Sequence, residues 1–291
     1  MADSDHLYRF VFEHAGVRGE IVQLDKAFRE VVRRRAYPPT LRELVGQGLA
    51  AAALLASTLK FTGSLSLQIQ SRGALRLFVV QVTSDRTVRA LARWDETADV
   101  DGDLSELCPG GNLVITIDPD DGGERYQGIV SLDAGSLAGA LDIYFRESEQ
   151  LPTRVWLATG DERSAGLLVQ RLPGEDDDTD AWNRAERLAA TISSRELLEL
   201  SAPQIIRRLF HEEDIRLFDP DPFRFRCTCS RDRIAGMLRG LGYEEAREIL
   251  DEQGSIEVRC EFCNEAYRFD AVDTEQVFAA AASPWVPSTR H

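Results

Sequence analysis

The spacing of four cysteines near the C-terminal end constrains this chain more than any other feature. Cys227 and Cys229 form a C-x-C pair, Cys260 and Cys263 form a C-x-x-C pair, and residues 230–259 separate the two pairs. Two short-range thiolate pairs from distant segments supply the four ligands of a tetrahedral zinc ion, with zinc–sulfur bonds of about 2.3 Å. The sequence therefore predicts one zinc ion bound by these sulfurs.

The segment around the cysteines contains no histidine, because His211 lies before it and His291 ends the sequence. The predicted site is all-thiolate, and four protein ligands leave no position for a reactive water. Helices are expected at residues 230–238 and 244–252, and a strand at 255–259. A module of this size buries too little apolar surface to be stable alone. A structural zinc contributes on the order of 10 to 16 kcal/mol, so losing the ion should unfold the module.

Arginines surround the predicted site and allow two interpretations. They are Arg224, Arg226, Arg231, Arg233, Arg259 and Arg268. Metal and cationic neighbours keep sulfurs as thiolates, the form that peroxide or hypochlorous acid attacks. Alternatively, the arginines are solvated surface and the site is a permanent zinc knuckle. A disulfide between cysteines one residue apart closes a small, strained ring, and strained disulfides are the labile kind. This favours a reversible switch, but the spacing leaves both interpretations open.

The first 173 residues alternate strand-like and helix-like patterns, which predicts an α+β core with a mostly antiparallel sheet. Alternating apolar residues, clearest at Leu65, Leu67 and Ile69, indicate strands. Strands are expected within 11–24 and at 64–70, 75–83, 88–94, 112–118, 125–132, 153–159 and 166–172. Helices are expected at 26–35, 40–60 and 137–147. Thr40 as N-cap and Glu43 as its capping-box partner would begin the second of these helices.

An acidic stretch at residues 173–180 is the clearest domain boundary in the sequence. Helices are expected beyond it at 181–200 and 203–211, with apolar faces that need a partner to cover them. Prolines and aspartates at 219–222 break the pattern again before the cysteine segment. The expected organisation is a core domain at 1–173, a helical linker at 174–222, a zinc-binding domain at 223–275 and a flexible tail at 276–291.

Charge and apolar patterning exclude several classes of protein. The chain has 49 acidic against 34 basic residues, a formal net charge of −15. Phosphate contacts need a surplus of cations, so this charge argues against the nucleic-acid-binding zinc ribbon that the arginines raise as an alternative. No apolar run approaches the roughly 18 residues of a membrane span, and acidic residues stand where a signal peptide needs basic ones. A cytoplasmic protein with reduced thiols and no membrane partner is expected.

Motifs of catalysis are missing from the sequence. His6 and His14 are isolated, and neither a G-x-S-x-G motif nor a phosphate-binding glycine loop appears. The acidic run at 175–178 lies in the expected linker rather than in a pocket. The sequence therefore predicts a protein that is not an enzyme. The fifth cysteine, Cys108, is expected to be an ordinary buried thiol.

Three further parts of the sequence resemble a known protein family, as the cysteine spacing does. They are Val17-Arg-Gly19 with Val22 and Leu24, the passage LLASTLKFTGSLSLQIQ from Leu54, and YFRESEQLPT at residues 144–153. In these segments and in its cysteine motif the chain resembles the redox-regulated heat-shock chaperones of about thirty-three kilodaltons, which are ATP-independent holdases of the bacterial cytosol. The likeness extends over the whole chain, and Cys108 is its one departure from the four-cysteine motif.

The resemblance implies a mechanism for the cysteine motif. In the reduced, inactive state Cys227, Cys229, Cys260 and Cys263 would bind zinc. Oxidants would join Cys227 to Cys229 and Cys260 to Cys263 as disulfides and release the ion. The module would then unfold, and the helical linker would lose the cover it packs against. The resemblance also implies a homodimer on activation and hand-over of clients to ATP-dependent refolding chaperones.

Apolar residues of the expected linker are the candidates for holding unfolding client proteins in the activated state. They are Leu188, Ile192, Leu197, Leu198, Ile205, Ile206 and Phe210. Each of them also suits the interior of an ordinary helical domain. Both roles are compatible, because a switch needs an element that is packed in one state and exposed in the other.

Overall fold

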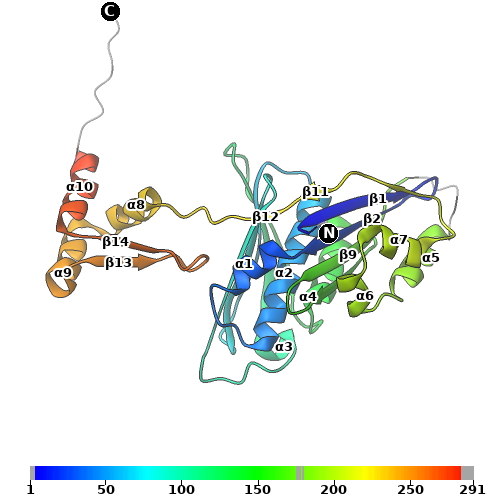
Figure 1. Cartoon of the computed structure of the whole chain (residues 1–291), viewed down its shortest axis with the longest axis horizontal. Coiled ribbons are helices and arrows are strands. Elements are labelled where there is room, and N and C mark those ends of the chain that lie inside the picture. The colour runs from blue at the N-terminus through cyan, green and yellow to red at the C-terminus, as the bar shows by residue number, and fades with distance from the viewer. Residues whose placement is uncertain (1–3, 175–177, 179, 283–291) are drawn as a thin grey trace, which may run out of the picture. The chain divides into compact units, whose positions relative to one another are not determined.

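The computed structural model describes residues 4–174, 178 and 180–282, and the chain forms two compact units (Figure 1). The N-terminal unit covers Met1–Arg226 and the C-terminal unit covers Cys227–His291. The helices expected as a linker belong to the N-terminal unit, and the division falls just before the first cysteine of the motif. Much of the expected acidic boundary, residues 175–177 and 179, lies outside the described residues.

Sheet A is a six-stranded sheet in the N-terminal unit, and all of its pairings are antiparallel. Its order is β10-β1-β2-β9-β8, and β11 also pairs with β1. The strands are β1 (His6–Phe12), β2 (Val17–Leu24), β8 (Thr153–Thr159), β9 (Ser164–Arg171), β10 (Ile215–Leu217) and β11 (Asp221–Pro222). Neighbouring residues of β2 and β9 enter two different apolar clusters, Ile21 and Leu167 one, Val22 and Leu168 the other. Both faces of this sheet are therefore covered.

Sheet B, also six-stranded, has the order β12-β5-β4-β3-β6-β7 and is antiparallel except for the pair β12–β5. Its strands are β3 (Gly63–Gln70), β4 (Leu75–Thr83), β5 (Thr87–Trp94), β6 (Asn112–Pro119), β7 (Tyr126–Ser131) and β12 (Arg224–Phe225). Leu65, Leu67 and Ile69 of β3 are fully buried, and the residues between them are partly exposed. The expected α+β class is confirmed, with two sheets where the sequence suggested one.

Helix α2 (Pro39–Thr58) packs against strands of both sheets and forms the centre of the unit (Figure 1). Its middle is buried, as its almost entirely apolar sequence predicts. Gly48 permits close packing on sheet B, because a Cβ at this position would lie 2.5 Å from Cζ of Phe78. The expected capping box at Thr40 is wrong. The helix begins at Pro39 without a side-chain cap, since proline suits the first position of a helix.

Helix α1 (Lys26–Val32) is shorter than expected and is capped from a distant part of the chain. The Asp5 carboxylate accepts hydrogen bonds from the backbone N–H groups of Asp25, Lys26 and Ala27 at 2.9, 3.2 and 2.9 Å. These contacts satisfy donors that a helix start leaves unpaired. The other helices of the core are α3 (Leu104–Leu107), which was not expected, and α4 (Leu137–Tyr144), which continues as the π-helical turn η1 (Phe145–Glu149).

The helices expected as a linker form three short segments on sheet A, namely α5 (Ala181–Ala189), α6 (Ser194–Glu199) and α7 (Ala202–Phe210). The single helix expected over 181–200 is interrupted, because Ser193 caps α6 by accepting a hydrogen bond from the Glu196 N–H at 3.2 Å. The apolar residues of these helices form one cluster with Phe10, Phe12 and Ile21. Sheet A is therefore the partner that covers their apolar faces.

Residues 215–225, here called the strap, end the N-terminal unit and pair with both sheets. β10 and β11 pair with β1, whereas β12 pairs with β5. The Asp221 carboxylate lies 3.1 Å from the Arg9 guanidinium and 2.8 Å from that of Arg86. Phe223, which lies between Asp221 and β12 along the chain, is buried in the main apolar cluster. The sequence indicated only a break here, because pairings of two residues leave no periodic pattern.

The C-terminal unit consists of α8 (Arg231–Leu241), α9 (Tyr243–Gln253), the hairpin β13 (Ile256–Arg259) and β14 (Ala266–Phe269), and α10 (Ala271–Ala282). Its buried apolar cluster is small and contains Ile234, Ala235, Leu238, Ala246, Ile256 and Phe269. The tail expected at 276–291 is helical as far as residue 282, because Val277 and Phe278 pack against this cluster. Residues 283–291 lie outside the described residues.

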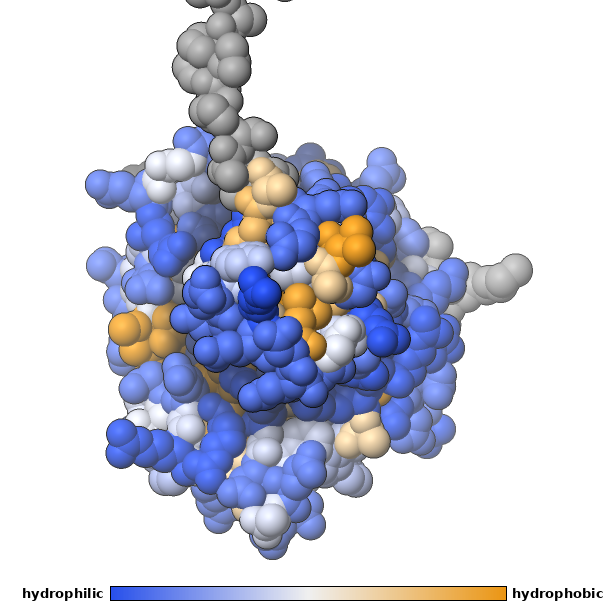
Figure 2. Space-filling view, turned by 90° about the vertical axis from the view of Figure 1, so that its left-hand side faces the viewer, coloured by the Kyte–Doolittle hydropathy of each residue, from blue (hydrophilic) through white to orange (hydrophobic). Residues whose placement is uncertain are grey.

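Exposed apolar surface is limited. Figure 2 shows a face that is mostly hydrophilic with small, separate apolar areas. In the C-terminal unit the exposed large apolar residues among those described are Met237, Leu241 and Val272. Over the described ranges, no helix combines the length and the apolar character needed to cross a membrane.

Candidate metal centre

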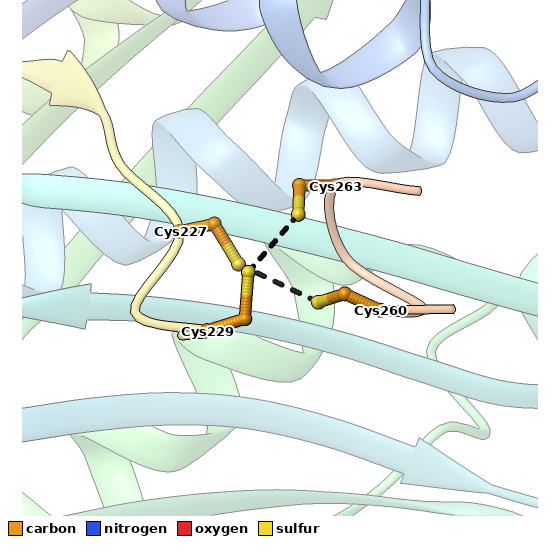
Figure 3. Close-up of side chains that lie close together, drawn as sticks. All are labelled: Cys227, Cys229, Cys260 and Cys263. Carbon is orange, nitrogen blue, oxygen red and sulfur yellow. Dashed lines mark hydrogen bonds between the residues drawn. The ribbon is translucent and has the colours of Figure 1, made fainter. Parts of the chain in front are cut away.

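The structure brings all four cysteines of the motif together, with their sulfurs pointing toward one another (Figure 3). Their Sγ atoms lie within 4.8 Å of one another. Contacts between sulfurs join the two motifs: Cys227 Sγ is 3.6 Å from Cys260 Sγ, and Cys229 Sγ is 3.3 Å from Cys263 Sγ. Within the described part of the chain, this is the one group of histidine, cysteine or acidic side chains placed to share a metal ion. We call it the sulfur cluster.

The donor set is compatible with zinc. Four sulfurs at about 2.3 Å from one ion in a tetrahedron lie about 3.8 Å apart. The sulfur contacts between Cys229 and Cys263 and between Cys227 and Cys260, at 3.3 and 3.6 Å, need to open by only a few tenths of an ångström to reach this spacing. Thiolates are soft ligands, and zinc is one of the few common metals that prefer them. The four cysteines therefore fit the zinc ion that the sequence predicts.

Two local structures position the sulfurs. Cys260 and Cys263 lie in the turn between β13 and β14, where the Cys260 N–H donates to the Glu265 carbonyl at 2.9 Å and the Asn264 N–H to the Cys260 carbonyl at 2.7 Å. Asn264 has a φ of 60°, in the left-handed region that asparagine tolerates better than most residues. The turn therefore directs both thiols to one side of the hairpin.

The C-x-C pair directly precedes α8. Ser230 caps this helix by accepting a hydrogen bond from the Arg233 N–H at 3.2 Å. The Arg233 guanidinium in turn donates to the Thr228 carbonyl, between the two cysteines, at 2.9 Å. The start of α8 thus fixes the backbone that carries Cys227 and Cys229.

A tyrosine hydroxyl contacts the sulfur cluster. The Oη atom of Tyr267, on β14, donates to Cys229 Sγ at 3.2 Å. The hydrogen bond to this thiolate raises the pKa of Tyr267 above its usual value. The sequence alone does not indicate this contact, because it joins residues 38 positions apart that no local pattern relates.

Cys227 and Cys263 differ in acidity. Burial raises the pKa of Cys227, but hydrogen bonds from the Cys229 backbone and from the other three thiols outweigh burial and lower it to about 7. Burial raises the pKa of Cys263, and hydrogen bonds to the neighbouring sulfurs raise it further. Holding all four sulfurs as thiolates in this space requires a cation.

Arginines near the cluster bind groups of the C-terminal unit. Arg231 lies 2.8 Å from the Asp273 carboxylate, donates to the Arg268 carbonyl at 2.8 Å and stacks 4.3 Å above the Phe269 ring. Arg259 pairs with Glu257 at 2.8 Å. These contacts tie α8, β14 and α10 together. They favour a structural role for these arginines over a surface that binds nucleic acid.

The predicted client-binding residues lie in the N-terminal unit, on or beside α5–α7. Leu197, Ile205, Ile206 and Phe210 are buried against sheet A, and Leu188, Ile192 and Leu198 are partly buried in the same cluster. Cys108 also lies in this unit, fully buried, with its Sγ 3.9 Å from the Leu75 carbonyl. Burial raises the pKa of Cys108, which makes it the unreactive thiol that the sequence predicts.

The sequence matches the profile of the family described as "Hsp33 protein" over residues 5–270. The chain belongs to the Hsp33 family. The 33 kDa chaperonin of Methylobacillus flagellatus is 50% identical over 282 residues, 96% of each chain, and that of Nitrosococcus oceani is 49% identical over the whole of both chains. The crystal structure of the 33 kDa chaperonin from Thermotoga maritima superposes with a TM-score of 0.82 at 24% identity, covering 95% of this chain and 99% of that one.

Membership in the Hsp33 family confirms the resemblance drawn from the sequence motifs. The relatives carry the name chaperonin, which supports a chaperone function for this chain and not an enzymatic one. The Thermotoga maritima structure, at its lower identity, supports the same α+β fold.

Proposed function

We propose that this Hsp33-family chain is a redox-regulated, ATP-independent holdase of the cytoplasm that binds unfolding proteins under oxidative stress. The observation that carries the proposal is the sulfur cluster, built into a unit whose buried apolar cluster is small. Zinc, when bound, would supply much of the folding free energy of that unit, on the order of 10 to 16 kcal/mol. Oxidation of the sulfurs would therefore also remove what stabilises the unit.

The redox step needs an oxidant such as peroxide or hypochlorous acid. A first thiolate attacks an oxygen of peroxide, which gives a sulfenic acid and hydroxide. A second thiolate then attacks that sulfur, forms the disulfide and releases a second hydroxide. The two sulfurs lose two electrons in total, and peroxide gains them.

We propose the pairs Cys227–Cys229 and Cys260–Cys263 for the oxidised state, on the strength of the family resemblance. Sulfur contacts of 3.6 and 3.3 Å in the cluster join the other combinations, Cys227 with Cys260 and Cys229 with Cys263. Peptide mapping of the oxidised protein by mass spectrometry distinguishes the two arrangements. Disulfides that join the C-x-C pair to the C-x-x-C pair would contradict the proposed pairing.

Helices α5–α7 are the proposed client-binding element. These helices are 9, 6 and 9 residues long, shorter than the roughly 12 to 15 residues that an isolated helix needs to be even marginally stable in water. Packing on sheet A therefore stabilises them. When they leave the sheet, Leu197, Ile205 and Phe210 become accessible together with Phe10 and Phe12 of β1. Homodimer formation and hand-over of clients to ATP-dependent chaperones complete the proposal.

Zinc release and holding activity, measured in the same samples of full-length protein, test the proposal. A colorimetric chelator reports zinc, and light scattering reports suppression of a heat-denatured client's aggregation. Peroxide should release zinc and produce holding activity, and a dithiol reductant should reverse both. Cys108→Ser is the matched control and should behave as wild type, because Cys108 is buried outside the cluster. Zinc release without holding activity, or equal activity in the reduced state, would refute the proposal.

A further inference from the structure

Tyr267 lies on the inner face of β14. Along this strand Tyr267 and Phe269 are partly or fully buried, whereas Ala266 and Arg268 are exposed. The strand register pairs Val258 with Tyr267, and the Tyr267 ring packs against the small apolar cluster of the C-terminal unit. Because strand alternation fixes this direction, the hydroxyl is carried toward the sulfurs rather than toward solvent.

The hydroxyl joins the two halves of the motif. Tyr267 follows the C-x-x-C turn, but its Oη donates to Cys229, which belongs to the C-x-C pair, at 3.2 Å. The Cys229 sulfur also lies 3.3 Å from the Cys263 sulfur. One side chain of β14 therefore holds in place a ligand that precedes α8.

We propose that Tyr267 is a positioning residue that orients the Cys229 sulfur for zinc and lowers its reactivity toward oxidants. The inference rests on the proposed redox function, since it names a residue that sets how readily that switch responds. A hydrogen bond to a thiolate withdraws electron density from the sulfur that would attack peroxide. Outer-shell hydrogen bonds to metal ligands are also worth roughly ten- to a hundredfold in metal affinity.

Tyr267→Phe isolates the hydroxyl, because the ring that packs in the apolar cluster stays. Tyr243→Phe is a matched control in the same unit, since the Tyr243 hydroxyl donates to the Glu275 carboxylate at 2.6 Å and not to a sulfur. Both variants lose one tyrosine hydrogen bond at an exposed or partly exposed position. A difference between them therefore reports the contact with Cys229.

The experiment uses full-length, zinc-loaded, reduced protein. Zinc release under excess peroxide should be about tenfold faster in Tyr267→Phe than in wild type, and zinc affinity about tenfold lower. Alkylation by iodoacetamide, mapped by mass spectrometry, should rise at Cys229 relative to Cys260 within the same molecules. Tyr243→Phe should match wild type in all three measurements.

Two outcomes would overturn the inference. One is zinc release and a Cys229 to Cys260 alkylation ratio that match those of wild type in Tyr267→Phe. The other is equal acceleration at both cysteines together with a lower unfolding temperature, which would show general loosening of the unit. The alkylation ratio does not depend on chaperone activity. A changed ratio in a protein that never holds clients would support the role of Tyr267 while refuting the proposed function.

Discussion

Replacing Phe210 by alanine should weaken the packing of helix α7 on sheet A and leave the sulfur cluster unchanged. Phe210 is the last residue of α7 and is 1% exposed. Its ring meets Phe12 edge-on at a centroid distance of 5.0 Å and lies 5.8 Å from Phe10. Truncating a buried phenylalanine to alanine costs about 3 to 5 kcal/mol. This free energy is lost from the packing of α7 on sheet A.

The consequence is a larger population in which the short helices have left the sheet. A free energy of 1.4 kcal/mol corresponds to a factor of ten, so 3 to 5 kcal/mol raises that population roughly one-hundred- to several-thousandfold. Phe210→Ala should therefore hold clients in reductant, with zinc still bound. Ile205→Val, at a fully buried position of the same helix, costs about 0.5 to 1.5 kcal/mol and should give a smaller effect in the same direction.

Light scattering of an aggregating client in the presence of reductant measures the gain, and zinc content measured on the same samples shows that the cluster is intact. Phe218→Ala is the control, because this ring is 39% exposed and lies outside the cluster on sheet A. A folded, zinc-loaded Phe210→Ala protein with no more holding activity than wild type would refute the reasoning. Client binding would then not require the surface between α7 and sheet A.

Three further perturbations test other parts of the chain. Cys263→Ser should lose zinc and make the C-terminal unit sensitive to trypsin even in reductant; unchanged zinc content and protease resistance would contradict the role of the metal. Gly48→Ala should destabilise the N-terminal unit by about 1 to 3 kcal/mol, because the new Cβ meets the Phe78 ring, and an unchanged urea midpoint would show that α2 shifts freely. Burial raises the pKa of Glu20 from 4.5 to about 7, so the folded chain keeps a proton that the unfolded chain releases. The free energy of unfolding should therefore fall by up to about 3 kcal/mol as pH rises from 4.5 to 7. In urea titrations this dependence on pH should be weaker for Glu20→Gln than for wild type. An identical pH dependence in both proteins would show that burial of Glu20 does not cause it.

Elements with a local signal were predictable from the sequence. β4 and β8 have the bounds that their apolar alternation indicates, residues 75–83 and 153–159. The sulfur cluster was predictable for a similar reason, because short spacing within each cysteine pair limits where the two thiols can point. The two cysteine pairs lie more than thirty residues apart, and no sequence pattern links them. That they come together could be predicted only because zinc needs four ligands.

Elements that depend on distant partners were not predictable. Asp5 caps α1 only because β1 brings it beside the helix start. The hydroxyl of Tyr267 meets Cys229 only once the hairpin and the start of α8 are both formed. Helix α10 continues through a run of alanines to residue 282, because Val277 and Phe278 pack against the apolar cluster of the C-terminal unit. In each case tertiary contact, and not local preference, decides the structure.

In the sequence, only the strap and the few residues beside it separate the sulfur cluster from helix α7, which packs on sheet A. The proposed switch can therefore act on α7 through this segment. Cys227 follows β12 after one residue, and β11, β10 and α7 precede β12 along the chain. β11 and β12 are two residues each, and the arginines that pair with Asp221 are about half exposed, so each ion pair contributes at most about 1 kcal/mol. We expect the strap to loosen before α7 when the C-terminal unit unfolds, because α7 buries Ile205, Leu209 and Phe210 in the apolar cluster on sheet A. Releasing the strap alone would not detach α7. The proposed switch therefore requires that the packed and detached states of α5–α7 be close in free energy already, which is the quantity that Phe210→Ala perturbs.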